Sequence, residues 1–182
     1  MEIREQETAA QQQYLTYFLA EEEYAINIQK VKEIIEYTAI TKVPKVPRWI
    51  RGVINLRGSV VPVVDLAVRF GLDERSVTKT SCIIIVEVQQ ETETTVMGVI
   101  ADAVNQVISL APEEIEQPPA FGTRVRLEYL DGMGKLGKKF ALILNIDRVL
   151  SSAELLTVSG LQNEQANPVR EDASEAALTP DA

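Results

Sequence analysis

The first apolar residues of the chain follow the two-residue period of a β-strand. An apolar run begins at Tyr14, and three glutamates at residues 21–23 form a turn. Apolar residues then return at alternate positions, Tyr24, Ile26 and Ile28. This alternation is typical of a half-buried strand. We therefore predict two strands joined by an acidic turn.

The next segment changes period. Val31, Ile34 and Ile35 stand at helical spacing and predict a short helix. Two prolines within residues 43–47 exclude both a helix interior and a central strand, because proline lacks the backbone N–H. Beyond a further apolar strand, residues 66–70 predict about one helical turn, which a glycine ends.

The second half of the chain repeats this plan. Residues 82–88 predict an apolar strand, residues 89–95 a polar turn, and residues 96–100 a second apolar strand. We align Ala25 with Gly98, a shift of 73 positions. Four further apolar positions then coincide, namely Ile26 with Val99, Val31 with Val104, Ile34 with Val107, and Ile35 with Ile108.

The later elements match at a shift of 79 to 80, so the second half carries an insertion of about six residues. Gly58 corresponds to Gly137, and Asp65 corresponds to Asn145. Asp65 and Asn145 each stand where a strand passes into a turn, which predicts two helix N-caps. We predict a tandem duplication that gives two similar β modules, packed together. Short strands with polar turns favour closed barrels, which remove sheet edges.

Composition limits the possible functions. The chain has 182 residues, of which 46% are hydrophobic, and this favours one domain or two small ones. Its net charge of −9 argues against long nucleic acid as a partner. It has no histidine, which excludes histidine-dependent catalytic triads and histidine-containing zinc sites. No metal or cofactor is predicted.

The single cysteine and the hydropathy of the chain add two expectations. Cys82 excludes an intrachain disulfide and, within an apolar strand, is expected in the core. The chain starts without an apolar signal segment, and no apolar run approaches the ~20 residues of a membrane span. We therefore expect a cytoplasmic protein.

Arg57 is the sharpest candidate for a binding residue. It stands between a leucine and a glycine in a predicted turn, and its guanidinium could hold a partner's carboxylate through two parallel hydrogen bonds. Residues 37–64 contain five basic residues and no acid, which suits an acidic partner. The alternative is a solvated loop arginine.

Two equivalent sets of residues form a second candidate. If the modules pack about a pseudo-twofold axis, these side chains line a groove that could hold a helix. The alternative is ordinary core packing. The residues are Val31, Glu33 and Ile34 in the first half, and Val104, Gln106 and Val107 in the second.

A different class of protein also has to be weighed. A phospho-acceptor receiver domain places an acidic pair after its first strand and an aspartate after its third. Residues 21–23 and Asp65 imitate that order. A receiver, however, needs long amphipathic helices between its strands, and residues 24–60 offer only one short predicted helix.

The segment GVINLRGSVVPVVDL at residues 52–66 resembles the CheW family of chemotaxis coupling proteins. The segments EEYAINIQKVKEII and VPKVPRWIRG precede it, and VMGVIADAVNQVISL and YLDGMGKLGKKFALILNIDRVL resemble the second half of the family. The resemblance implies two five-stranded SH3-like β-barrels and no catalysis. It also implies two partners: chemoreceptor cytoplasmic tips and the regulatory domain of the histidine kinase CheA.

The resemblance also implies positions for both contacts. A receptor helix would lie near Ile28, Val31, Ile34 and Val104, in the groove that Glu33 and Val107 extend. The kinase would contact the first module near Gly52 and Gly58. Arg57 matches the loop arginine of the family and would serve coupling to a partner that stays open.

The expected organisation has three parts. Residues 1–13 form a flexible arm, and residues 14–151 form the CheW-like domain, whose halves divide near residues 73–81. Residues 152–182 form a short helix and an acidic, disordered tail. The expected function is a scaffold between receptors and kinase recruited to receptor arrays at the inner membrane. The alternatives are an adaptor of pilus motility or gene regulation, and a receiver-type switch at Asp65.

Overall fold

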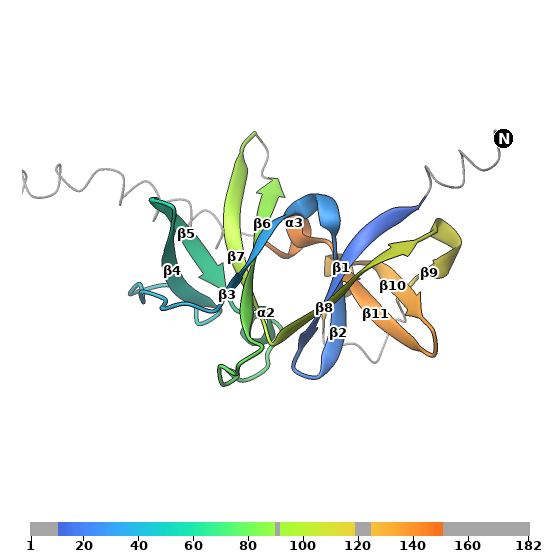
Figure 1. The fold of residues 1–182 in the computed structure, drawn as a ribbon, viewed down its shortest axis with the longest axis horizontal. Coiled ribbons are helices and arrows are strands. Elements are labelled where there is room, and N and C mark those ends of the chain that lie inside the picture. The colour runs from blue at the N-terminus through green and yellow to red at the C-terminus, as the bar shows by residue number, and fades with distance from the viewer. Residues whose placement is uncertain (1–10, 90–91, 119–124, 151–182) are drawn as a thin grey trace, which may run out of the picture.

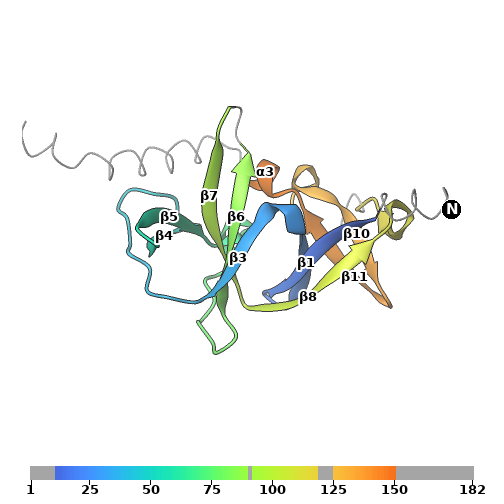
Figure 2. The same ribbon diagram turned by 45° about the horizontal axis from the view of Figure 1, so that its top comes forward.

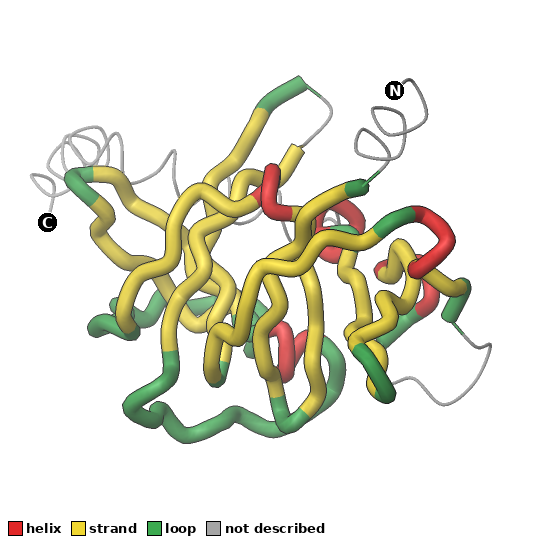
Figure 3. The backbone as a smooth tube through the Cα atoms, turned by 45° about the vertical axis from the view of Figure 1, so that its right-hand side comes forward, coloured by secondary structure: helices red, strands yellow, loops and turns green. Residues whose placement is uncertain are grey.

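The computed structural model describes residues 11–89, 92–118 and 125–150. Two sheets dominate it (Figure 1), and its helices are short (Figure 3), so the mainly β prediction is confirmed. Closure of either sheet into a barrel stays a prediction. The predicted arm and tail lie largely outside the described residues, although the first strand already begins at Gln12.

The six-stranded sheet has the order β8-β1-β2-β11-β10-β9. Its strands are β1 (Gln12–Leu19), β2 (Glu22–Asn27), β8 (Ala103–Leu110), β9 (Ile115–Glu116), β10 (Leu130–Leu136) and β11 (Lys139–Leu144). The five-stranded sheet has the order β3-β6-β7-β5-β4. Its strands are β3 (Val31–Glu36), β4 (Ile50–Leu56), β5 (Ser59–Val64), β6 (Cys82–Gln89) and β7 (Thr94–Ala101).

Short helical turns connect these strands. Two are α-helical, α2 (Leu66–Arg69) and α3 (Ile146–Val149). Three are 3₁₀ turns, η1 (Ile28–Lys30), η2 (Pro112–Glu114) and η3 (Leu127–Tyr129). Among the described residues no helix is long and apolar enough to cross a membrane.

The two sheets share one topology. The repeat pairs β1 with β6, β2 with β7, β3 with β8, β4 with β10, and β5 with β11. Under this pairing the order β3-β6-β7-β5-β4 becomes β8-β1-β2-β11-β10, which is the order of the other sheet without β9. Each sheet therefore combines two strands from one repeat with strands from the other. The repeats meet in two antiparallel pairs, β1 with β8 and β3 with β6, and in two parallel pairs, β2 with β11 and β5 with β7.

The helix predicted at residues 31–35 is wrong, because these residues form strand β3. Val31 pairs with Val86 and Glu33 pairs with Ile85, so the register of β3 against β6 shifts by one residue. This β-bulge adds a residue to β3, and it brings Val31 and Ile34 onto one face of the sheet. A bulged strand thus shows the three-residue spacing that usually indicates a helix.

Both predicted helix N-caps are confirmed. The Asp65 side chain accepts a hydrogen bond from the backbone N–H of Val68 (3.3 Å). The Asn145 side chain accepts one from the backbone N–H of Arg148 (3.1 Å). Each cap satisfies a free N–H at the start of a one-turn helix.

A central core joins the two sheets. It contains Tyr17 and Tyr24 of the six-stranded sheet together with Ile84 and Met97 of the five-stranded sheet, all buried. Cys82 belongs to the same cluster, so its predicted place in the core is confirmed, and burial raises the pKa of its thiol. This shared core couples two sheets that are each too small to bury much surface alone.

Candidate functional site

The residues predicted to bind a receptor lie on η1 and on the edge strands β3 and β8. Val31 and Ile34 stand opposite Val86 and Ile84 of β6, and these two β6 residues belong to the central core. On β8, Val104 and Val107 stand opposite Tyr17 and Leu15 of β1, which belong to the same core. Directly paired residues point to the same face of a sheet, so all four side chains turn toward the junction of the sheets.

We call Ile28, Val31, Ile34, Val104 and Val107 the apolar strip. Ile28, Val31 and Val104 are half-buried and pack against the central core. Ile34 and Val107 are 44% and 50% exposed. Figures 1 and 2 show β3 and β8 on either side of the junction between the sheets. The strip thus has a packed base and two exposed apolar side chains, one from each repeat.

Glu33 faces away from the strip and pairs with Arg57. The two terminal guanidinium nitrogens of Arg57, Nη1 and Nη2, donate to the two carboxylate oxygens of Glu33, at 2.6 and 2.7 Å. Arg57 lies in the turn between β4 and β5, and its side chain is 74% exposed, whereas that of Glu33 is 27% exposed. These hydrogen bonds hold the pKa of Glu33 below its usual value.

The sequence suggests an Arg57 fork that is free for a partner's carboxylate, whereas in the structure Glu33 occupies it. The pair also connects β3, one outer strand of the five-stranded sheet, with the turn that follows β4, its other outer strand. Nothing in the spacing of two residues 24 positions apart indicates such a contact. The sequence does indicate a two-residue turn at Arg57 and Gly58, and the first side chain of such a turn points outward.

A hollow of about 670 Å³ opens beside this pair, and we call it the hairpin hollow. Glu33 and Arg57 stand at its charged side, with Leu56, Ile85 and Val96 among its apolar lining residues. Leu56 and Val96 also pack on the small core inside the five-stranded sheet. The hollow therefore combines an apolar floor with one fixed ion pair, which suits a protein surface better than a small charged ligand.

The equivalent turn in the other sheet lacks this ion pair. There Leu136 pairs with Lys139 across the turn, as Leu56 pairs with Ser59, so Gly137 takes the place of Arg57. The predicted correspondence of Gly58 with Gly137 is therefore wrong by one position, and Lys138 takes the place of Gly58. The place of Glu33 is taken by Gln106 under the repeat. Of the two turns, both of which the structure describes, the β4–β5 turn alone carries this ion pair.

The two glycines predicted to contact a kinase differ in their surroundings. Gly52 is buried, and a Cβ at this position would lie 2.0 Å from the backbone oxygen of Thr41. Gly58 is exposed, with a φ of 86°, and a Cβ added there would have no atom within 4 Å. Gly58 lies on the surface beside Arg57, whereas Gly52 can act only by holding the 37–49 loop against β4.

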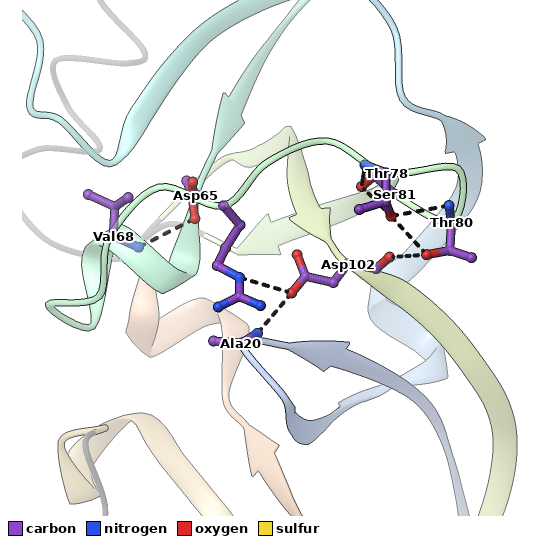
Figure 4. Close-up of polar contacts among 8 residues, drawn as sticks. Ala20, Asp65, Val68, Thr78, Thr80, Ser81 and Asp102 are labelled. Carbon is purple, nitrogen blue, oxygen red and sulfur yellow. Dashed lines mark hydrogen bonds and ion pairs between the residues drawn. The ribbon is translucent and has the colours of Figure 1, made fainter.

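A polar joint that the sequence did not indicate connects the sheets at Asp102 (Figure 4). Asp102 lies where the chain passes from β7 to β8. Its carboxylate accepts a hydrogen bond from the backbone N–H of Ala20 (2.9 Å) and lies 3.6 Å from Nε of Arg75. Its backbone carbonyl accepts one from the hydroxyl of Thr80 (2.9 Å). The joint ties the β1–β2 turn to the 72–81 loop.

The receiver alternative is inconsistent with this structure. The described part of the fold has no alternation of strands with long helices, and Asp65 is only 3% exposed. Burial raises the pKa of Asp65 more than Arg51 lowers it. The part of the chain that is described contains no group of three or more His, Cys, Asp or Glu residues that could hold a metal ion.

Comparison with known proteins gives concordant findings. The family model described as CheW-like domain matches residues 13–154. The chain is 37% identical over 150 residues to the chemotaxis protein CheW of Klebsiella aerogenes, covering 82% of this chain and 88% of that protein. It is 31% identical over 149 residues to the chemotaxis protein CheW of Treponema pallidum, with the same two coverages, 82% and 88%.

A solved structure extends the similarity to three dimensions. The crystal structure of the scaffolding protein TtCheW from Thermoanaerobacter tengcongensis matches with a TM-score of 0.69 and 36% sequence identity. The match covers 79% of this chain and 90% of that one.

Proposed function

The chain belongs to the CheW family of chemotaxis scaffold proteins, and we propose that it couples chemoreceptor tips to the regulatory domain of the histidine kinase CheA. It is a scaffold rather than an enzyme. In this proposal it works in the cytoplasm, within receptor arrays at the inner membrane.

The receptor contact in this proposal is the apolar strip. Ile34 and Val107 offer exposed apolar side chains from the two repeats, and Val31 and Val104 stand beside them at the packed base. A receptor tip that presents apolar residues at helical spacing could bury these side chains. Glu33, on the other face of β3, would support this surface without touching the receptor.

The kinase contact in this proposal is the β4–β5 turn with the hairpin hollow. Gly58 leaves the turn flat and open, and Arg57 fixes its position through Glu33. The apolar floor of the hollow gives a partner domain a surface to bury. Gly52 contributes indirectly, by allowing the loop of residues 37–49 to lie against β4.

The observation that carries the proposal is that β3 contributes a residue to each of the two proposed contact surfaces. One face of β3 presents Ile34 to the strip, and the other face presents Glu33 to Arg57. A receptor that shifts β3 would therefore displace the turn that contacts the kinase. A scaffold that couples two partners needs such a shared element.

A charge placed on the strip tests the receptor contact. We expect Ile34→Asp or Val107→Asp to weaken binding of receptor tips about 30-fold, the loss of roughly 2 kcal/mol that follows removal of one anchor side chain. Val77→Asp is the matched control, since Val77 is 52% exposed but belongs to the 72–81 loop rather than to η1, β3 or β8. Receptor affinity would be measured by titration, and folding by a melting curve.

Kinase binding by the same variants separates the two contacts. Ile34→Asp should leave it within about twofold of the unmodified protein, because Ile34 does not line the hairpin hollow. The proposal is wrong if folded Ile34→Asp and Val107→Asp bind receptor as tightly as Val77→Asp does.

A further inference from the structure

The 37–49 loop between β3 and β4 presents a basic surface on an acidic protein. It carries Lys42, Lys45 and Arg48, all exposed. Among the described residues none of these three forms an ion pair, although the whole chain has a net charge of −9. Three exposed cations without counter-charges are a surface that an anionic segment can bind.

The loop also forms a hollow of about 370 Å³, which we call the loop hollow. Ile40, Val43 and Val46 give it an apolar lining, and Lys42 and Arg48 line it as well. Glu74, the acid in this lining, is paired with Arg51 at 2.6 Å. The loop is held to β4 by two backbone hydrogen bonds between Thr41 and Val53, both 2.9 Å. The surface is therefore anchored and combines apolar and basic parts.

The same chain contains a segment of complementary composition. Residues 169–181 carry one basic residue, Arg170, and four acids, namely Glu171, Asp172, Glu175 and Asp181. Val169 and Leu178 provide apolar side chains before and within this run. We propose that residues 169–181 dock in cis on the loop hollow, with their acids paired to Lys42, Lys45 and Arg48.

The length of the tail permits this contact. Leu150 is the last described residue, and 20 residues separate it from Glu171. Twenty residues of random-coil chain span about 25 Å on average, and a folded domain of this size has a radius of gyration of about 14 Å. These two lengths are comparable, so the length of the tail is compatible with docking in cis, at an effective concentration in the millimolar range.

Charge favours the tail over other occupants. Long nucleic acid would meet the negative field of the rest of the protein. A separate acidic protein would have to bind at its own, lower concentration, whereas the tail is always present. Docking of the tail would cover the basic loop and would restrict it to partners that compete with the tail.

Amide chemical shifts test the proposal. We would compare the full chain with a chain that ends at residue 162, at low and at high salt, in heteronuclear NMR spectra. We expect shift differences clustered in residues 37–51 at about 0.01 M salt. They should largely disappear at about 1 M salt, where the Debye length falls from about 30 Å to about 3 Å.

Two charge-matched triple variants identify the surface. Lys42→Gln, Lys45→Gln and Arg48→Gln together should abolish the difference between the full and truncated chains. Lys135→Gln, Lys138→Gln and Lys139→Gln remove the same charge from the β10–β11 hairpin and should leave it unchanged. Glu171→Gln, Asp172→Asn, Glu175→Gln and Asp181→Asn together should imitate truncation.

Any one of four outcomes would overturn the inference. In the first, truncation changes no amide shift in residues 37–51. In the second, the amide shift changes cluster on another surface. In the third, the shift changes persist when Lys42, Lys45 and Arg48 are all replaced by glutamine. Shift differences that grow with protein concentration would also overturn docking in cis, since they indicate contact between copies of the chain.

Discussion

Gly52→Ala tests how the buried glycine of β4 supports the 37–49 loop. The backbone at Gly52 has a φ of 144°, a region that residues with a Cβ rarely adopt. An added Cβ would lie 2.0 Å from the backbone oxygen of Thr41 and 2.9 Å from Cγ2 of Ile40. Because backbone atoms occupy the space, the loop and β4 cannot both keep their places.

The expected cost follows from what the substitution separates. Moving the loop away breaks the two 2.9 Å backbone hydrogen bonds between Thr41 and Val53. Each such bond contributes about 1 kcal/mol net, and an alanine at a positive φ adds about 1–2 kcal/mol of strain. The free energy of unfolding should therefore fall by about 3–4 kcal/mol, which lowers the melting temperature by roughly 10 °C in a domain of this size.

Gly58→Ala is the matched control. Gly58 also has a positive φ, 86°, but a Cβ there meets no atom within 4 Å. Gly58→Ala should lower the free energy of unfolding only by the backbone strain, about 1–2 kcal/mol. The assay is thermal and urea unfolding of both variants. If Gly52→Ala melts within about 2 °C of Gly58→Ala, a difference of at most about 1 kcal/mol, the steric role assigned to Gly52 is wrong.

Two further predictions concern charged residues. Arg57→Gly copies Gly137 of the other turn, so it should raise the melting temperature slightly, by relief of about 1 kcal/mol of strain. It should also reduce receptor control of kinase autophosphorylation, and carboxyl NMR should show the pKa of Glu33 returning toward its usual value. Unchanged receptor control of the kinase in this variant would contradict the role of the ion pair. Burial raises the pKa of Asp65 above 3.8 in the folded protein, so the folded state loses stability relative to the unfolded state as pH rises through the folded pKa. Asp65→Asn keeps the cap acceptor but cannot ionise, so in urea unfolding its stability relative to the unmodified protein should increase over that pH range. A stability difference that stays constant with pH would refute the raised pKa.

The sequence predicted the strands and caps well because their signals are local. Alternating apolar residues depend on which face of a strand is buried, and Asp65 and Asn145 cap the turns that directly follow them. The helix at residues 31–35 was wrongly predicted for an equally physical reason. A β-bulge shifts the alternation by one residue, and only the pairing of β3 with β6 reveals it.

The repeat predicted two similar modules but not how they are assembled. Matching positions show that two segments share a fold, yet they do not show which copy of a strand pairs with which. In the structure β1 and β2 join the strands of the second repeat, and β6 and β7 join those of the first. Parallel pairing between repeats, such as that of β5 with β7, cannot be predicted from the spacing of apolar and polar residues.

The comparison of the two turns separates what the fold needs from what the site needs. Both turns have two residues and the same register, so the fold is satisfied by Gly137 at the first position. Arg57 takes that position at a φ of 51°, where an L-residue is strained. Since the fold does not require this arginine, its strain is best explained by its side chain, which holds Glu33 of β3 from the opposite edge of the sheet. This difference between two turns of the same register is the structural reason for proposing that the β4–β5 turn acts on a partner.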